Sequence, residues 1–448
     1  MTSLFGTDGV RGIANRDLTA DLAFRLACAG AHVLNHRQDR PWVLVGKDTR
    51  LSCDMLEAAL CAGFLSQGLH VVRLGVIPTP GVAWLTRHTP EAACGVMISA
   101  SHNPAEYNGI KFFSHDGYKL PDQVEETIES RMNEKPVHEA EYGLEPGTYI
   151  HEPMVERYSN HLASTVPQKL AGLSVSMDTA NGAASEMAPF LFAALGARVQ
   201  AIHNKPDGRN INHRCGSTHV EDLQHHVVEK GTHMGFAFDG DADRLIAVDE
   251  NGSIVDGDRL MAMLALNLKE QGKLPQNTLV TTVMSNLGLE LAMNQAGCQL
   301  IRTQVGDRYV LEEMRKNQLI LGGEQSGHII MSDYNTTGDG ILTALQVAAL
   351  VRQSGKPLSQ LAGVMKTCPQ VLINAQVHNH LKNAYTKDPE IVREIRSMEN
   401  KMAGRGRVLI RPSGTEALVR VMLEGNDQEE LTDMATELAR LIEQRLGC

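Results

Sequence analysis

Residues 95–113 of this chain read GVMISASHNPAEYNGIKFF, and the rest of the sequence can be organised around them. The stretch opens with an apolar run, Val96-Met97-Ile98, that is typical of a buried strand. It then changes to small and polar residues and meets Pro104, and proline is favoured at the first position of a helix. We therefore expect a strand that passes into a turn or a helix start, where unpaired backbone N–H groups favour an anion. A serine there, Ser101, can carry a phosphate or can simply cap a helix.

The composition is that of a globular protein with several domains. A chain of 448 residues is too long for one hydrophobic core, and 42% hydrophobic with 21% charged residues is an ordinary balance for such a chain. The net charge of −11 argues against a general nucleic-acid binder, although local arginines can still bind small anions.

Targeting signals and cysteines indicate the compartment. The longest apolar run, 260–268, is bounded by charged residues and is too short to span a bilayer, and the first residues do not resemble a signal peptide. The eight cysteines are scattered without a CxxC pair, which indicates reduced thiols. We therefore expect a cytoplasmic protein with no membrane and no nucleic-acid partner.

A strand–helix–strand order occurs three times along the chain. The apolar runs 43–45, 173–177 and 278–283 are each followed by a polar turn, a helical segment and a second strand introduced by a glycine. This order is typical of parallel βαβ units. It predicts an α/β fold with three similar domains that contain mixed sheets.

Each of the three rounds ends in a polar cluster that follows an apolar strand. The clusters are SASHNP at 99–104, DGDADR at 239–244 and GGEQSGH at 322–328. Ligands of open α/β sheets bind beyond the carboxyl ends of the strands, so we expect the three clusters to face one central cleft.

The last part of the chain has a different pattern. It predicts a strand at 371–377, a helix after Asp388-Pro389, a strand at 408–410 that leads into a turn, another strand to 423 and a closing helix. We expect a smaller C-terminal α+β domain after a linker near 366–369. The predicted domains are 1–152, 153–252, 253–366 and 367–448.

The cluster at 239–244 places three aspartates, Asp239, Asp241 and Asp243, at alternating positions. Two unit charges in contact repel by about 4 kcal/mol at an effective dielectric constant near 20, so such a group needs a cation unless it is a solvated acidic turn. Few, all-oxygen ligands suit Mg²⁺. A calcium EF-hand is rejected, because Arg244 occupies the position where the sharp turn requires glycine.

Two further clusters can bind the parts of a sugar phosphate. Arg411, Ser413 and Thr415, with Arg420 nearby, can form a phosphate cradle of hydroxyls, backbone N–H groups and guanidinium forks, although an arginine beside a turn is also common on surfaces. In GGEQSGH, Glu324 and Ser326 can bind sugar hydroxyls. His328 can move a proton near neutral pH, or it can be a histidine satisfied within the loop. The glycine-rich opening brings Arg11 near a ligand or leaves it on a surface turn.

Taken together, these motifs resemble the α-D-phosphohexomutase family across essentially the whole chain. The phosphoserine, metal, sugar and phosphate loops of that family match residues 99–104, 239–244, 323–328 and 411–415. The segments FGTDGVRG, PDGRNINHRCGST and RTQVGDRYV, together with Gln325, are similar to the branch that acts on phosphoglucosamine. Ala242 stands where glycine is commoner in the family, and we expect ordinary backbone angles there and an unchanged ligand set.

The resemblance implies an isomerase that interconverts glucosamine 6-phosphate and glucosamine 1-phosphate through glucosamine 1,6-bisphosphate, for UDP-N-acetylglucosamine synthesis. The implied alternative is a phosphomannomutase or phosphoglucomutase. Ser101 would be the phosphoserine and, with the three aspartates, a ligand of one Mg²⁺ per chain. The other residues that the resemblance implies are His102, Lys111 and His328 with Arg11 and Arg244 in catalysis, Glu324 and Ser326 on the sugar, and Arg411, Ser413, Gly414, Thr415 and Arg420 on the phosphate.

The same resemblance implies the partners. The substrate would be a hexosamine phosphate, and glucosamine or glucose 1,6-bisphosphate would serve as intermediate or activator. The sequence does not determine the oligomeric state, and a homodimer is one state that it allows.

Overall fold

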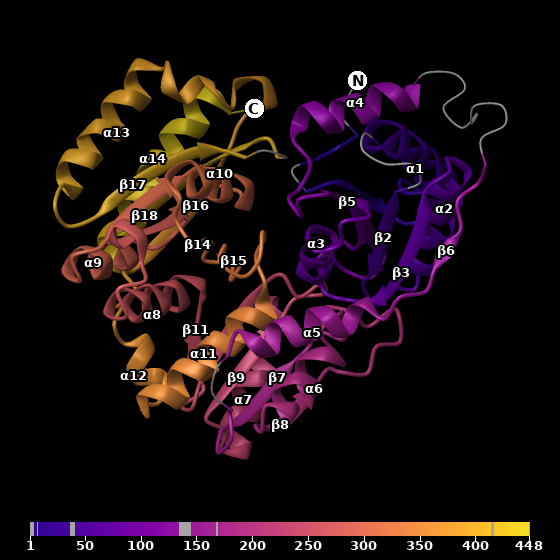
Figure 1. The fold of residues 1–448 in the computed structure, drawn as a ribbon. Coiled ribbons are helices and arrows are strands. Elements are labelled where there is room, and N and C mark those ends of the chain that lie inside the picture. Colours follow the sequence, from indigo (N-terminus) through magenta and orange to yellow (C-terminus); the bar gives the residue numbers. More distant parts are fainter. Residues whose placement is uncertain are drawn as a thin grey trace. The chain divides into compact units, whose positions relative to one another are not determined.

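The chain forms two compact units in the computed structural model, which describes residues 4–6, 8–35, 41–133, 145–166, 169–413 and 416–447. The first unit comprises Met1–Val283 and Gln299–Gly363, and the second comprises Met284–Cys298 and Val364–Cys448. Three sheets lie in the first unit and one in the second (Figure 1). The domain boundaries near residues 152, 252 and 366 stay predictions.

The first sheet has the order β1-β5-β4-β2-β3-β6. Strands β4, β2, β3 and β6 run parallel, whereas β5 is antiparallel to β4, and β1 is antiparallel to β5. The strands are β1 (Val10–Ile13), β2 (Trp42–Lys47), β3 (His70–Val76), β4 (Ala92–Ile98), β5 (Tyr107–Ser114) and β6 (Tyr149–Ile150). The helices of this part are α1 (Ala20–Leu34), α2 (Cys53–Ser66), α3 (Thr79–Arg87) and α4 (Asp122–Asn133).

The second and third sheets have the orders β11-β10-β9-β7-β8 and β13-β12-β14-β15. Their strands are β7 (Ser174–Asp178), β8 (Arg198–Ile202), β9 (Met234–Phe238), β10 (Leu245–Asp249), β11 (Ile254–Val255), β12 (Thr278–Thr282), β13 (Gln299–Thr303), β14 (Leu321–Gly323) and β15 (Ile329–Met331). The helices are α5 (Met154–Ser164), α6 (Met187–Ala194), α7 (Glu221–Lys230), α8 (Gly257–Glu270), α10 (Asp307–Asn317), α11 (Gly340–Ser354) and α12 (Leu358–Ala362).

The three sheets share one arrangement of four strands. Spatially it reads β5-β4-β2-β3 in the first sheet, β10-β9-β7-β8 in the second and β15-β14-β12-β13 in the third. In each sheet three of these strands are parallel. The fourth strand, β5, β10 or β15, is antiparallel to the strand that precedes it in the chain, β4, β9 or β14. This confirms the prediction of three similar α/β domains with mixed sheets.

The three polar clusters are the connections of these antiparallel hairpins. The cluster at 99–104 joins β4 to β5, the cluster at 239–244 joins β9 to β10, and the cluster at 322–328 joins β14 to β15. The expected helix start at Pro104 is therefore wrong, and the alternative of a turn is right. The chain must reverse onto the neighbouring strand, and the Tyr107 N–H bonds the Pro104 carbonyl at 3.1 Å within that turn.

Helices α1 and α2 pack on the first sheet around one apolar core. Leu26 of α1, Leu60 and Phe64 of α2 and Val45 of β2 are buried in it. A Cβ atom at Gly63 would lie 2.6 Å from the Ala27 Cβ atom, so glycine allows the two helices to approach closely. Within the described residues, no helix combines the length and the hydropathy that crossing a membrane requires.

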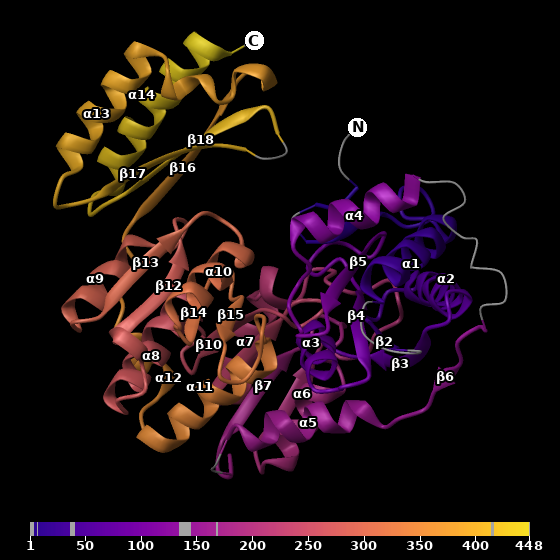
Figure 2. The same cartoon turned by 45° about the horizontal axis from the view of Figure 1, so that its top comes forward.

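The second unit is a small α+β domain, as predicted. Its antiparallel sheet has the order β16-β18-β17, and helices α13 and α14 lie beside it (Figure 2). The elements are α9 (Leu287–Gln295), β16 (Gln370–Gln376), α13 (Pro389–Met402), β17 (Arg407–Pro412), β18 (Leu418–Glu424) and α14 (Gln428–Leu446). Short 3₁₀ turns occur in the chain at Gly216–Thr218, Pro275–Asn277, Asn379–Leu381 and Ala384–Thr386.

Asp388 confirms the predicted helix start in this unit. Its carboxylate accepts hydrogen bonds from the N–H groups of Glu390 and Ile391, which would otherwise lack partners at the first turn of α13.

Asp339 joins the start of α11 to α5 in the first unit. Its Oδ1 accepts from the Leu342 N–H at 2.9 Å, and its Oδ2 accepts from the Tyr158 hydroxyl at 2.7 Å and from Asn335 at 3.0 Å. All of these side chains are buried. Removal of the carboxylate would leave a helix end and a phenol without their partner.

We predict that Asp339→Ala lowers the free energy of unfolding by about 3 kcal/mol, because it removes a helix cap and leaves a buried hydroxyl unsatisfied. Tyr158→Phe removes one hydrogen bond and should cost about 1 kcal/mol. Urea denaturation of both variants, followed by circular dichroism, measures the difference. An Asp339→Ala protein as stable as Tyr158→Phe would contradict this role of Asp339.

Candidate functional site

Ser101 lies at the turn between β4 and β5 and is 1% exposed. Its backbone is left-handed, with φ of +52°, a conformation that costs a residue with a side chain roughly 1–2 kcal/mol. The Ser101 N–H donates to Ser99 Oγ at 2.9 Å, and the Ser99 hydroxyl donates to Asp48 Oδ2 at 2.6 Å. Asp48, which directly follows β2, thus holds the Ser101 turn in its left-handed conformation through Ser99.

Arg50 and Asn212 hold the carbonyl groups of the same loop. The buried Arg50 guanidinium pairs with Asp48 at 3.0 Å and donates to the carbonyls of Ser101, Asn103 and Pro104 at 2.6–3.0 Å. Asn212 donates to the carbonyls of Ser101 and Asn103 at 2.8 and 3.0 Å. Both residues were missed as site residues from sequence. The charged pair Asp48 and Arg50 at the carboxyl end of a strand was the available signal.

The three aspartates lie together in the β9–β10 turn, next to Ser101. Asp239, Asp241 and Asp243 are at most 4% exposed, and one carboxylate oxygen from each lies within 4.8 Å of the others. The Ser101 hydroxyl donates to Asp239 Oδ2 at 2.6 Å. The structure therefore brings together residues 101 and 239–243, which are far apart in the chain.

Ala242 corrects one expectation about this turn. It has φ of +55°, so it adopts the left-handed conformation rather than the ordinary angles that we expected for alanine. The reversal from β9 into β10 requires this conformation between Asp241 and Asp243.

The carboxylates fit a hard divalent cation such as Mg²⁺. Oδ1 of Asp241 and Oδ1 of Asp243 are buried and have no hydrogen-bond partner among the described residues. Burial, together with Asp243 and Asp241, raises the pKa of Asp239 well above its usual value. Carboxylate oxygens are ligands that Mg²⁺ takes in proteins, with water or phosphate oxygens completing its octahedral shell.

Lys111 contacts this cluster from β5. Its Nζ lies 2.8 Å from Asp241 Oδ2 and 3.2 Å from Asp8 Oδ2, and the side chain is 2% exposed. Burial alone would lower the pKa of Lys111, but Asp241 and Asp8 raise it above its usual value. Thr79 donates to the same Asp241 oxygen at 2.6 Å.

His328 approaches the cluster from the β14–β15 turn. Its Nδ1 lies 3.5 Å from Asp243 Oδ2, and its Nε2 lies 3.5 Å from Asp307 Oδ2. Burial would lower the pKa of His328, but Asp243 and Asp307 raise it above the usual value. When the ring is neutral, the Gly338 N–H donates to Nε2 at 3.1 Å, which leaves the proton on Nδ1, towards Asp243.

Arg244 and His102 pair beside the serine. The Arg244 guanidinium donates to His102 Nδ1 at 2.9 Å, and Ser101 Oγ lies 3.4 Å from the same nitrogen. Burial, followed by the charges of Arg244 and Arg11, lowers the pKa of His102 to about 4, so the ring is neutral at physiological pH. Arg11 pairs with Asp8 on the N-terminal segment.

The two predicted sugar-binding residues lie in the β14–β15 turn. Glu324 Oε1 accepts from the Gly306 N–H at 3.3 Å, and burial raises the pKa of Glu324. Ser326 is exposed.

Asp8, Lys119 and Asp307, which lie beside Lys111 and His328, were not predicted as site residues, although Asp8 and Asp307 each adjoin a glycine.

The predicted phosphate loop belongs to the second unit. Arg411 and Arg420 are directly opposite each other on β17 and β18, and burial together with Arg420 lowers the pKa of Arg411. Like charges at facing positions are unfavourable without an anion between them. Ser413 is buried and accepts from the Glu416 N–H at 3.2 Å. Gly414 and Thr415 lie outside the described residues.

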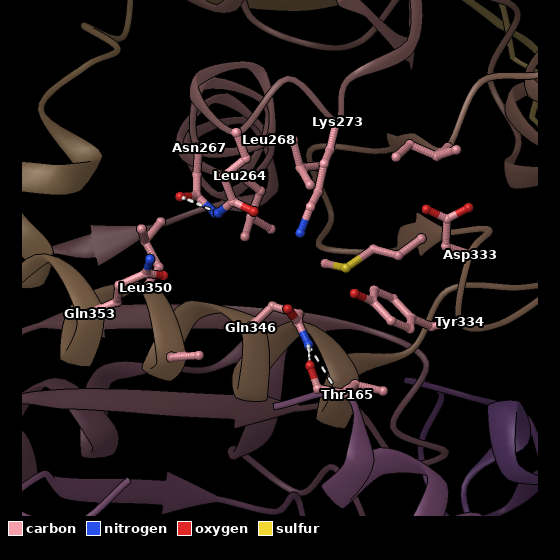
Figure 3. Close-up of a pocket in the computed structure, with 14 residues that line it drawn as sticks. Thr165, Leu264, Asn267, Leu268, Lys273, Asp333, Tyr334, Gln346, Leu350 and Gln353 are labelled. Carbon is pink, nitrogen blue, oxygen red and sulfur yellow. Dashed lines mark hydrogen bonds between the residues drawn. The ribbon is translucent and has the colours of Figure 1, made fainter. Parts of the chain in front are cut away.

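A separate cavity of about 210 Å³ lies between α8, α11 and the segment after β15 (Figure 3). Lys273, Gln346 and Tyr334 point into it, and Gln346 donates to Thr165 at 3.1 Å. None of the residues that line it belongs to the serine or carboxylate clusters. The chemistry of the site is therefore concentrated at the hairpin turns and not in this cavity.

We predict that one Mg²⁺ binds per chain and that its affinity falls as the pH is lowered. The raised pKa of Asp239 means that protons compete with the metal at pH values above the usual aspartate pKa of about 3.9. Isothermal titration calorimetry at neutral and at mildly acidic pH measures the change.

Asp241→Asn should weaken the binding by more than roughly tenfold, a loss that even an altered outer-shell partner can cause. Asp222→Asn, at a carboxylate that is 62% exposed, is the matched control and should bind Mg²⁺ like the parent. Equal affinities in the parent and Asp241→Asn would refute the assignment of this site.

Comparison with known proteins covers the whole chain. Four family models match, described as phosphoglucomutase/phosphomannomutase alpha/beta/alpha domains I, II and III and the C-terminal domain, at residues 2–138, 156–252, 256–368 and 372–441. The phosphoglucosamine mutase of Alkaliphilus oremlandii (strain OhILAs) is 57% identical over 450 residues, with 100% of both chains covered.

Solved structures share the fold. A phosphoglucomutase/phosphomannomutase family protein from Burkholderia thailandensis is similar with a TM-score of 0.84 and 23% identity, over 99% of this chain and 98% of that chain. The N-acetylphosphoglucosamine mutase of Aspergillus fumigatus, in complex with GlcNAc-6P and magnesium, is similar with a TM-score of 0.66 and 18% identity, over 98% of this chain and 95% of that one. From its four matched domains and its full-length relatives, this chain belongs to the phosphoglucomutase/phosphomannomutase family.

Proposed function

We propose that the protein is a phosphoglucosamine mutase, an isomerase that converts glucosamine 6-phosphate to glucosamine 1-phosphate through a phosphoserine at Ser101. The observation that carries the proposal is the Ser101 hydroxyl 2.6 Å from Asp239, within a cluster of three buried carboxylates. The 57% identity to a phosphoglucosamine mutase over the full length supports the choice of substrate. The product would supply UDP-N-acetylglucosamine synthesis.

The reaction consists of two phosphoryl transfers at Ser101. In the first, O1 of glucosamine 6-phosphate attacks the phosphorus of phosphoserine, a P–O1 bond forms, the bond to Ser101 Oγ breaks, and glucosamine 1,6-bisphosphate results. The bisphosphate then turns around. In the second transfer Ser101 Oγ attacks the phosphorus at position 6, the bond to O6 breaks, and glucosamine 1-phosphate leaves. Such transfers depend mainly on positioning and on charge stabilisation.

Asp239, Asp241 and Asp243, with an oxygen of the Ser101 phosphate, would hold Mg²⁺. When bound, the ion supplies charge neutralisation for the phosphate, which carries about −1.5 to −2 charges at neutral pH, and it polarises the phosphorus. Asp241 and Asp243 each have a buried carboxylate oxygen with no hydrogen-bond partner among the described residues, and Arg244 Nε lies 3.8 Å from that of Asp243.

The side chains around Ser101 have complementary roles in this proposal. Lys111 and His328 are the groups proposed to transfer protons to and from the oxygen atoms that react. Arg244 and Arg11 stabilise the phosphoryl group during transfer, and the neutral His102 ring is held beside Ser101 by Arg244. His102 therefore orients the reacting groups and accepts a hydrogen bond rather than contributing a charge.

Other residues would bind the substrate in both of its orientations. Glu324 and Ser326 would bind the sugar hydroxyls. The residues proposed for the phosphate that is not transferred are Arg411, Ser413, Gly414, Thr415 and Arg420. A hydroxyl-rich and cationic set of this kind matches a sugar phosphate.

The function is tested by a coupled assay with glucosamine 6-phosphate, Mg²⁺ and a trace of glucose 1,6-bisphosphate. We expect turnover by the parent and a loss of at least roughly 1,000-fold in Ser101→Ala, because the group that is phosphorylated is gone. Intact-mass spectrometry should show a parent species heavier by one phosphoryl group, which Ser101→Ala lacks. Ser130→Ala, at an exposed serine of α4, is the matched control.

Full turnover by Ser101→Ala would disprove the covalent mechanism. The alternative function is that of a phosphomannomutase or phosphoglucomutase, because the serine and carboxylate clusters serve any hexose phosphate. Comparison of kcat/KM for glucosamine, glucose and mannose phosphates distinguishes the two, and a clear preference for mannose would overturn the choice of glucosamine.

A further inference from the structure

Lys119 lies between two carboxylates that come from distant parts of the chain. Its Nζ is 2.5 Å from Asp8 Oδ1 and 2.7 Å from Asp307 Oδ2. Asp8 precedes β1, Lys119 follows β5, and Asp307 is the first residue of α10. The three side chains are only 21–23% exposed, so this is not an ordinary surface ion pair.

Each of the two carboxylates also lies near a residue that we assign to proton transfer. The second oxygen of Asp8, Oδ2, lies 3.2 Å from Lys111 Nζ. Oδ2 of Asp307, which contacts Lys119, also lies 3.5 Å from His328 Nε2. Lys111 in turn contacts Asp241, and His328 contacts Asp243. A chain of contacts between acidic and basic side chains therefore leads from Asp241 through Lys119 to Asp243.

The surroundings of Lys119 fix its position. Thr336 donates to the carbonyl of Gly117 at 2.6 Å, and the Arg315 guanidinium of α10 lies 4.1 Å from the centre of the Tyr118 ring. At the other side of Asp307, the Gly306 N–H contacts Glu324. The start of α10 is therefore tied to Lys119, to His328 and to the sugar-binding turn at once.

We propose that Lys119 is a positioning residue for the phosphoryl transfer, a role that rests on the proposed function. Lys119 lies between Asp8 and Asp307 and reduces the repulsion between these two carboxylates, while Asp8 also pairs with Arg11 and Lys111. Asp8 then keeps its contact with Lys111 Nζ, and Asp307 keeps its place 3.5 Å from His328 Nε2. A lysine suits this place because its ammonium group can donate to two carboxylates in different directions.

The test is Lys119→Met, which keeps the length of the side chain and removes the charge. We expect kcat for glucosamine 6-phosphate to fall roughly 100-fold, the scale of a misplacement of about 1 Å in the reacting groups, with little change in KM. Lys119→Arg keeps a cation and should recover part of kcat. Lys316→Met, at a lysine of α10 that is 72% exposed, is the matched control and should behave like the parent.

Circular dichroism and intact mass establish that each variant is folded and phosphorylated at Ser101. If Lys119→Met does not fold, Asp307→Asn decides, because it removes the charge from the pair with almost no change of shape, and the same loss of kcat is expected. If the parent is active and kcat is unchanged in Lys119→Met or in Asp307→Asn, the proposal is overturned. Equal impairment of Lys119→Met and Lys119→Arg overturns it as well, whereas an inactive parent would instead refute the proposed function.

Discussion

The mutual repulsion of three buried carboxylates is the constraint on which the rest of the site depends. Asp239, Asp241 and Asp243 lie in one short turn and are almost inaccessible to water. Each pair in contact would repel by about 4 kcal/mol at an effective dielectric constant near 20, which is a large part of a typical total stability of 5–15 kcal/mol. Two cations reduce this repulsion, Lys111 from β5 and Arg244 from the acidic turn itself, and His328 contacts Asp243 from the β14–β15 turn.

The repeated sheet explains how such a cluster can be assembled. Each of the three mixed sheets contains an antiparallel hairpin, and each hairpin turn carries functional side chains: Ser101, the three aspartates, or Glu324 with His328. Each turn also contains one residue in the left-handed conformation, namely Ser101, Ala242 or Gly327. A short turn of this kind leaves few accessible conformations, so its side chains are positioned before a substrate binds.

Much of the fold follows from local patterns in the chain. The three strand–helix–strand rounds and the antiparallel C-terminal sheet appear where hydrophobic periodicity predicts them, because burial of one face dictates that periodicity. Local hydrophobic patterns do not predict which strands pair with each other. Whether the chain after residue 104 forms a helix or returns as β5 depends on the free edge of β4, which no local signal describes.

The sequence by itself determined the residue types of the site and their order: a serine after a strand, three alternating aspartates, the GEQSGH turn and the RPSGT loop. Tertiary structure alone decided which side chains hold them. Arg50 and Asn212 grip the carbonyls of the serine turn, and Asp8, Lys119 and Asp307 link Lys111 to His328 across hundreds of residues. The physical reason is that hydrogen bonds and ion pairs act over a few ångströms in space, and separation along the chain carries no information about that distance.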